Sequence, residues 1–177
     1  LLVPTFSTAL GLAYAVWIDK SRGERYYKAL VFMPMAISFV GAGIIWRFVY
    51  EYKAAGRDQI GLLNAFVVAF GGEPVQWMQT DPINTILLIV VMIWIQTGFA
   101  MVVLSAAIKG IPTEQIEAAM LDGTNPWQRF ANVTVPGIRG ALVVALTTIS
   151  IATLKVFDIV RTMTGGNFNT SVVANEM

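Results

Sequence analysis

The sequence predicts an all-α fold, a polytopic membrane helical bundle, on three observations. Hydrophobic residues make up 56% of the 177 residues and charged residues only 13%, whereas an ordinary soluble domain has about 25% charged residues. The mean hydropathy is +0.65. Uncharged runs close to the roughly 20 residues that cross a bilayer recur along the chain. A soluble chain this apolar would need a larger core than 177 residues can enclose.

Three such runs predict spanning helices at Leu1–Ile18, at Ala29–Trp46 with a continuation to Tyr50, and at Ile83–Ile108. Gly140–Met163, which is apolar in its first half and carries Lys155, Asp158 and Arg161 in its second, predicts a further span, so that about four are expected. Pro34 is expected to kink the second helix, because proline removes a backbone hydrogen bond. Gly41-Ala42-Gly43 in the same helix provides a surface of small residues that another helix can approach closely.

The loops between these runs predict the orientation. The short loop 19–28 contains Lys20, Arg22, Arg25 and Lys28, and short loops rich in Lys and Arg are usually cytoplasmic. Residues 51–82 then form an external loop, in which Ile60–Phe70 is a helix too short to span. The third helix returns the chain to the cytoplasm, so residues 109–139 are expected to form a cytoplasmic loop.

The loop 109–139 predicts two short helices joined at a glycine. Thr113 is expected to cap a helix over Glu114–Asp122, and Gly123 to end it in the left-handed conformation. Asn125-Pro126-Trp127-Gln128 is typical of a new helix start, with a cap, a proline in the first turn and a glutamine that closes a capping box. Pro136-Gly137 is expected to end this second helix.

Several apolar side chains of this loop have no core of their own, namely Met120, Leu121, Trp127 and Phe130. An exposed apolar patch with charges around it usually marks a surface for a partner. The alternative is that the loop packs on the ends of its own spanning helices, and part of it is expected to do so.

Polar residues inside the predicted spans are candidates for lining a solute pathway. Gln96 lies in the third span, where a structural bond to a neighbouring helix is the alternative role. Lys155 and Asp158 lie three residues apart in the last span and are expected to share a helix face. Charges at this depth must be paired, reach the interface or face water, so a lining role and a pair at the outer interface both remain open.

The loop also carries a motif: Glu117-Ala118-Ala119, three residues, Gly123, nine residues, Val133, one residue, and Val135-Pro136. It resembles the EAA loop of ABC importer permeases, with the two valines in place of Ile and Leu. Gly61-Leu62-Leu63-Asn64-Ala65, Ile111-Pro112 and Thr164-Gly165-Gly166 are similar to the carbohydrate-uptake branch, which includes maltose, glycerol-phosphate and alpha-glucoside permeases.

This resemblance implies the core of a type I importer permease, multi-pass in the plasma membrane of a bacterial-type cell, with residues 1–177 as a fragment of one permease domain. The implied partners are a dimer of cytoplasmic ABC ATPase subunits, a second permease subunit, an external solute-binding protein, a sugar and membrane lipid. Glu117 would bind within a groove of the ATPase, and Gly123 would form the corner. The implied coupling residues are Glu117, Ala118, Ala119, Leu121, Asp122, Gly123 and Pro136.

Composition argues against catalysis by this chain. It lacks a G-x-x-x-x-G-K-[ST] phosphate loop, so ATP hydrolysis would take place on another subunit. It has no cysteine or histidine, which removes thiolate metal sites and a conventional catalytic triad, and no cofactor is expected. A net charge of +1 gives no basic field for nucleic acid.

Two other function classes remain as alternatives. In an ion-coupled secondary transporter, Lys155 and Asp158 would form the coupling pair. A structural membrane subunit or an intramembrane enzyme is the other class, although the membrane runs offer only Asp158 as a catalytic carboxylate. The chain opens inside an apolar run, and Ser171–Met177 is expected to start a further element, so we expect a piece of a longer protein.

Overall fold

The structure is a computed structural model that describes residues 1–54, 56, 58–167 and 170. Within these residues it contains helices, turns and loops but no strand, which confirms the all-α prediction. The chain divides into two compact units, each described by itself. Unit 1 comprises Leu1–Met35 and Ile93–Ile151, and unit 2 comprises Ala36–Met92 and Ala152–Met177.

In unit 1, the predicted first span is helix α1 (Leu2–Ile18), and the predicted third span is α5 (Ile83–Lys109), which enters the unit at Ile93. A Cβ added at Gly11 of α1 would lie 2.5 Å from the Cβ of Ala100, so the two helices approach at backbone distance. The buried core of the unit gathers Ala15, Ile18, Met101, Leu104, Ile111 and Ile138.

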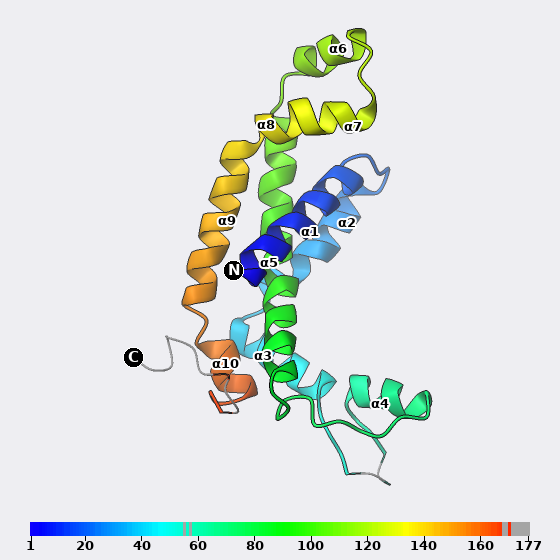
Figure 1. Ribbon diagram of the computed structural model, residues 1–177, viewed down its shortest axis with the longest axis vertical. Helices are drawn as coiled ribbons and strands as arrows, with labels where there is room; N and C mark the ends of the chain where they lie inside the picture. The colour runs from blue at the N-terminus through cyan, green and yellow to red at the C-terminus, as the bar shows by residue number, and fades with distance from the viewer. Residues whose placement is uncertain (55, 57, 168–169, 171–177) are drawn as a thin grey trace. The chain divides into compact units, whose positions relative to one another are not determined.

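After α5, unit 1 continues with the loop that carries the motif. The elements of this loop are α6 (Thr113–Leu121), α7 (Pro126–Arg129), a π-helical turn (Phe130–Thr134) and α8 (Val135–Gly137). Helix α9 (Arg139–Leu154) follows and leaves the unit after Ile151. Figure 1 shows α6 beyond the end of α5, with the chain turning back from it into α7.

The second predicted span is interrupted. It begins within α2 (Glu24–Phe32), continues through a 3-10 turn (Met33–Ala36) that contains Pro34, and ends with α3 (Phe39–Val49). The kink expected at Pro34 is therefore confirmed, and it extends to a complete break. Ser38 starts the new helix, because its Oγ accepts a hydrogen bond of 3.1 Å from the backbone N–H of Gly41.

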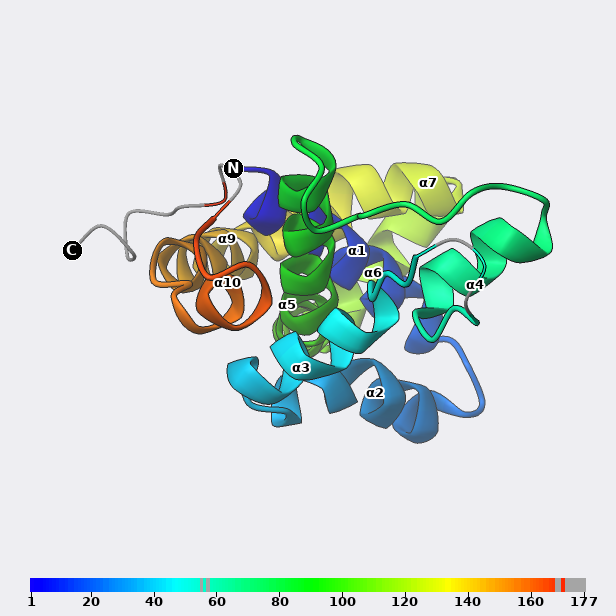
Figure 2. The same ribbon diagram turned by 90° about the horizontal axis from the view of Figure 1, so that it is seen from below.

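In unit 2, α3 packs against α10 (Asp158–Met163), and Figure 2 shows the two helices side by side. A Cβ added at Gly43 would lie 3.1 Å from the Cβ of Thr162, and Ala42 is fully buried. The prediction that the small residues of this helix admit a close neighbour is thus confirmed for Ala42 and Gly43.

The helix expected in the external loop is present as α4 (Leu62–Ala69), also in unit 2. It is followed by Gly71 at a φ of +82°. The chain turns again at Thr164–Asn167, where Gly165 and Gly166 are both at positive φ. The element expected at Ser171–Met177 lies outside the described residues.

The prediction of one continuous helix over Gly140–Met163 is wrong. Helix α9 ends at Leu154, residues 155–157 are not helical, and α10 begins at Asp158. The two charges suit such a break, because a cation is favoured beyond a helix C-terminus and a carboxylate in the first turn of a new helix. Lys155 and Asp158 therefore do not share a helix face.

By length and composition, α5 is the one described helix that can cross a membrane unaided. Two further crossings are possible if α2 to α3, and α7 to α9, each count as one bent span, and α1 has 17 residues. Large apolar side chains on these helices are exposed, among them Trp17, Phe48, Val102, Val143 and Leu154. Such a surface suits lipid or another subunit better than water.

Candidate functional site: the corner between α6 and α7

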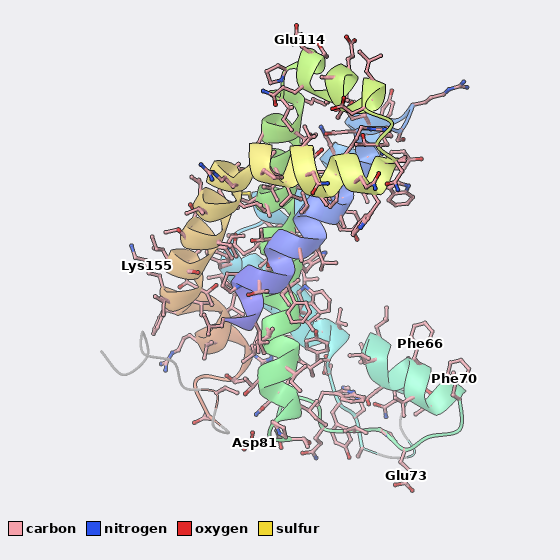
Figure 3. The ribbon with its side chains drawn as sticks, turned by 45° about the horizontal axis from the view of Figure 1, so that its top comes forward. Phe66, Phe70, Glu73, Asp81, Glu114 and Lys155 are labelled. Atoms are coloured by element: carbon pink, nitrogen blue, oxygen red, sulfur yellow. The ribbon has the colours of Figure 1, made fainter. Side chains whose placement is uncertain are left out.

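Helix α6 begins at Thr113 with Pro112 in the cap position, and no side chain caps it. The expectation that Thr113 is the cap is therefore wrong by one residue. Pro112 has an extended backbone (ψ 133°), a conformation that ends α5 and starts a new helix without the threonine hydroxyl. Glu114 lies in the first turn as expected, where the helix dipole favours a carboxylate, and Figure 3 shows it at the tip of this unit.

Gly123 forms the corner, as predicted. Its φ is +73°, a region that side-chain-bearing residues rarely adopt. The turn is closed by hydrogen bonds from the backbone N–H of Gly123 to the Met120 carbonyl (3.0 Å) and from that of Thr124 to the Ala119 carbonyl (3.2 Å). A Cβ at Gly123 would meet no atom within 4 Å, so the requirement for glycine is purely one of backbone conformation.

Helix α7 carries the predicted capping box. The Gln128 N–H donates to Asn125 Oδ1 (2.8 Å), and the Asn125 N–H donates to Gln128 Oε1 (2.9 Å). Arg129 reaches back across the corner, and its Nη1 donates to the Thr124 carbonyl. These bonds fix the direction in which the chain leaves Gly123.

The second helix ends at Pro136-Gly137 as expected: its last segment, α8, ends at Gly137 and contains Pro136. The preceding π-helical turn accommodates it: the Val135 N–H donates to the Phe130 carbonyl, five residues back. The widened turn relaxes the usual i to i−4 pattern just where proline has no N–H to donate. The helix then ends at Gly137, and the chain bends by 65° into α9.

The corner presents apolar side chains that nothing in the unit covers. The exposed fractions are 52% for Met120, 89% for Leu121 and 72% for Trp127. The Trp127 ring packs at a 5.6 Å centroid distance on Phe130. Ala119 is 9% exposed and packs inward, whereas Met120, Leu121 and Trp127 face outward, as expected of apolar side chains without a core of their own.

The structure brings together four of the predicted coupling residues. Ala118, Ala119, Asp122 and Pro136 line one shallow groove between α6 and the segment 132–137. Glu117 and Leu121 lie outside that groove, and both are exposed. A corner with a small-residue groove and protruding apolar side chains has the features of a docking element.

The predicted pathway residues are not brought together. Gln96 lies in the part of α5 that belongs to unit 1 and is 7% exposed. Lys155 and Asp158 are exposed in unit 2 and form no ion pair with each other in the described residues. Figure 3 shows the Lys155 side chain pointing outward where α9 ends.

A charge cluster that was not predicted from the sequence lies at the end of the helices next to the corner. It is formed by Asp19, Glu24, Lys28, Ser105 and Lys109. Lys28 Nζ lies 2.6 Å from Asp19 Oδ1 and 2.7 Å from Glu24 Oε1. Ser105 Oγ donates to Asp19 Oδ1 at 2.8 Å. The i, i+4 spacing of Glu24 and Lys28 was a signal for their pairing, but Ser105 is 86 residues from Asp19.

This charge cluster joins α1, α2 and α5. Glu24 also pairs with Lys109, the last residue of α5. Hydrogen bonds from Lys109 and then from Lys28 lower the pKa of the Glu24 carboxyl. Since Lys109 is followed within four residues by α6, the cluster anchors the base of the corner to α1 and α2.

The sequence of the chain is similar to those of known membrane transport proteins. Residues 7–176 match the family model described as "Binding-protein-dependent transport system inner membrane component". The chain is 56% identical over its full length to an alpha-glucoside transport system permease protein of Rhizobium meliloti. It is 55% identical, over 99% of its length, to an osmoprotective compounds uptake permease protein of Synechocystis.

The fold has relatives among solved structures too. A bacterial ABC transporter that imports the acidic polysaccharide alginate matches 99% of this chain and 64% of its own, with a TM-score of 0.81 and 21% identity. The present chain spans 53% and 63% of the length of the two curated relatives above. A match across 7–176 is nearly the whole chain, and it agrees with the motif around the corner. The chain therefore belongs to the family of inner membrane components of binding-protein-dependent transport systems.

Proposed function

We propose that the chain is part of the transmembrane subunit of an ATP-driven ABC importer for a neutral sugar or sugar-like solute, and that the corner between α6 and α7 docks into a cytoplasmic ATPase subunit. The observation that carries the proposal is the exposure of Leu121 and Trp127 on a corner whose backbone is fixed by Gly123 and a capping box. Family membership supports the same role.

In this proposal the corner moves as a rigid unit together with the ATPase subunit into which it docks. Met120, Leu121 and Trp127 insert into an apolar groove of the partner, and exposed Glu117 binds polar groups at its rim. Closure of the ATPase dimer then displaces α6. The hydrogen bonds around Gly123 and the charge cluster at the end of α5 transmit that displacement to the spanning helices. Hydrolysis takes place on the partner subunit, so this chain is not an enzyme and needs no cofactor.

The solute class rests on the names of relatives. The R. meliloti relative is named for alpha-glucosides, and a relative from Thermococcus litoralis, 33% identical over 92% of this chain, is named for trehalose and maltose. A second permease subunit and an external binding protein complete the proposed importer. The binding protein would deliver the sugar on the side of the membrane that carries α4.

An ion-coupled secondary transporter is the weaker alternative. It relied on Lys155 and Asp158 as a coupling pair, and a break in the helix separates these residues. This alternative also leaves the exposed corner without a role.

The test uses the full-length permease reconstituted with its second permease subunit, ATPase and binding protein. We expect ATP hydrolysis to rise with maltose or trehalose. We also expect Gly123→Ala to reduce the sugar-dependent part of hydrolysis several-fold, because a non-glycine residue at positive φ costs about 1 kcal/mol. Gly71→Ala is the matched control, since Gly71 also has a positive φ and open space around it.

Four outcomes would change these conclusions. Normal coupling in Gly123→Ala would contradict the role of the corner. Equal losses in both variants would show that the effect is general strain. Hydrolysis that ignores every sugar would overturn the solute class, and uptake that continues without any ATPase subunit would favour the secondary transporter.

A further inference from the structure

Unit 2 contains a cleft that the coupling mechanism does not use. It has a volume of about 630 Å³, within the roughly 300–1,000 Å³ typical of small-molecule sites. Its walls come from the C-terminal end of α3, the segment 50–52, the segment 76–79 and the end of α10. The lining combines aromatic rings with planar polar side chains, chiefly Arg47, Glu51, Tyr52, Gln76, Trp77 and Gln79.

One buried amide holds two walls of this cleft in place. Asn64 of α4 is fully buried, and its Nδ2 donates to the carbonyls of Glu51 and Val75, each at 3.0 Å. Its Oδ1 accepts from the Val75 N–H at 2.9 Å and from Trp77 Nε1 at 2.8 Å. All the hydrogen-bonding capacity of the amide is used, and the Trp77 ring is held in one orientation.

Gly61, the first residue of the motif that contains Asn64, lets α4 reach this position. A Cβ there would lie 2.0 Å from the Glu51 carbonyl oxygen. Neither Gly61 nor Asn64 lines the cleft. The motif Gly61–Ala65, which the coupling role leaves unexplained, thus has a physical function: it fixes the positions of Glu51 and Trp77.

The polar side chains of the cleft have unused hydrogen-bonding groups. Within the residues that the structure describes, the Arg47 guanidinium and the side-chain amides of Gln76 and Gln79 make no hydrogen bond or ion pair, whereas Glu51 has a single loose pairing with Lys53 at 4.0 Å. Arginine offers five donors, and each amide offers donors and an acceptor. Such groups beside a fixed aromatic ring suit a ring with an apolar C–H face and hydroxyls along its edge.

The charges in the cleft also indicate the net charge of the ligand that it can bind. Arg47 and Glu51 carry opposite charges on the same walls, so a strongly anionic solute would meet a carboxylate and a cationic one a guanidinium. A neutral polyhydroxylated ring uses both as hydrogen-bonding partners without a charge of its own to desolvate.

We propose that this cleft is a binding site of the permease itself for a neutral sugar, with Trp77 as the stacking platform and Arg47, Glu51, Gln76 and Gln79 as hydroxyl partners. The proposal rests on the proposed function, since it takes the transported solute as the ligand. The cleft would receive the sugar after its release from the binding protein.

The experiment measures uptake of radiolabelled maltose and trehalose by proteoliposomes that hold the complete full-length transporter. The concentration of sugar-saturated binding protein is varied, which separates the maximal rate from the half-saturating concentration. We expect Trp77→Leu and Arg47→Gln each to lower the maximal rate about 10-fold, while the half-saturating concentration stays within about 2-fold, as for the loss of an interaction made after docking.

Matched controls lie in the same unit. Phe70→Leu removes an aromatic side chain that is 88% exposed and does not line the cleft, and Figure 3 shows Phe70 at the end of α4, near Phe66. Arg161→Gln removes an exposed arginine of α10 that does not line the cleft. Both controls should transport like the unmodified protein. Because Arg47 has no partner in the described residues, its variant also tests the site independently of any folding defect in Trp77→Leu.

Each other outcome overturns the inference. If both cleft variants match their controls while the unmodified transporter imports sugar, the cleft is not a solute site, and the proposed function stands. If the half-saturating concentration rises instead, the cleft contacts the binding protein. If the unmodified transporter imports neither sugar, the proposed solute class fails and the inference fails with it.

Discussion

Two regions of the molecule hold distant segments together by opposite means. In unit 1 the charge cluster joins the ends of α1, α2 and α5 through ionised side chains, whose exposed fractions range from 11% for Asp19 to 51% for Lys109. In unit 2 a single neutral side chain, Asn64, joins α4 to the segments around Glu51 and Trp77 and is fully buried.

The difference follows from the cost of burial. A carboxylate or an ammonium group loses more hydration free energy than its pairing returns when it is fully enclosed, so the cluster keeps contact with solvent. An amide with all its hydrogen bonds satisfied can be enclosed at little cost. The contribution of the charge cluster to stability should therefore depend on salt concentration and pH. The contribution of the Asn64 contacts should change only when a substitution alters the shape or the hydrogen bonds of that side chain.

The largest effect is expected from Gly61→Ala. The added Cβ would lie 2.0 Å from the Glu51 carbonyl oxygen, far inside van der Waals contact, and a backbone atom cannot move aside as a flexible side chain can. Overpacking of this kind costs up to about 3 kcal/mol. The midpoint of thermal unfolding of the full-length protein in detergent should fall clearly, whereas Gly140→Ala, with open space around its Cβ, should leave it unchanged.

Asn64→Ala is expected to have the second largest effect. It should lower the free energy of unfolding by about 2 kcal/mol, because it leaves buried donors and acceptors without partners. Asn64→Asp keeps the acceptor for Trp77 Nε1 and the Val75 N–H but loses the donor to two carbonyls, so it should destabilise as well. The thermal midpoint in detergent is again the measure. A loss that depends on salt concentration would contradict the view that these contacts are neutral.

Lys28→Met should lower the free energy of unfolding by a smaller amount, about 1 kcal/mol, because the lysine is partly exposed and solvent screens its ion pairs with Asp19 and Glu24. Its removal leaves the Asp19 carboxylate with Ser105 as its remaining partner in the cluster. A double-mutant cycle with Asp19→Asn isolates the pair from other effects. A coupling energy of zero would show that this ion pair adds nothing to the contact between α1 and α2.

The smallest expected effect is that of pH and salt on the contribution of Glu24 to stability. The pKa of Glu24 is lowered from its usual 4.5 by Lys109 and Lys28. Its contribution to stability is therefore fully present above about pH 4.5 and is lost as the pH falls through the lowered pKa. High salt should weaken the exposed pair with Lys109 as well. In a Glu24→Gln variant the thermal midpoint should lose part of its dependence on acid and salt, and an unchanged dependence would refute this assignment.

Much of the fold was predictable because its causes are local. Uncharged runs long enough for a bilayer predicted α1 and α5, and small residues predicted the close contact at Gly43. The corner was predictable for the same reason. A positive φ at Gly123 and the capping box of Asn125 and Gln128 depend on neighbouring residues alone, and the motif around them identified the family.

Only the tertiary structure revealed two kinds of feature. One is the contacts between residues far apart in the chain, and the other is helix ends at which local sequence signals conflict. The break after Leu154 was missed because apolar composition favours a continuous span, whereas Lys155 and Asp158 are better accommodated at helix ends. The pairing of Asp19 with Ser105 and the bonds of Asn64 to Val75 and Trp77 join distant segments, and no periodicity predicts them. Hydrophobic runs and backbone preferences thus determined which segments are helices, and only packing decided which polar groups meet, because a buried hydrogen bond needs both partners in place.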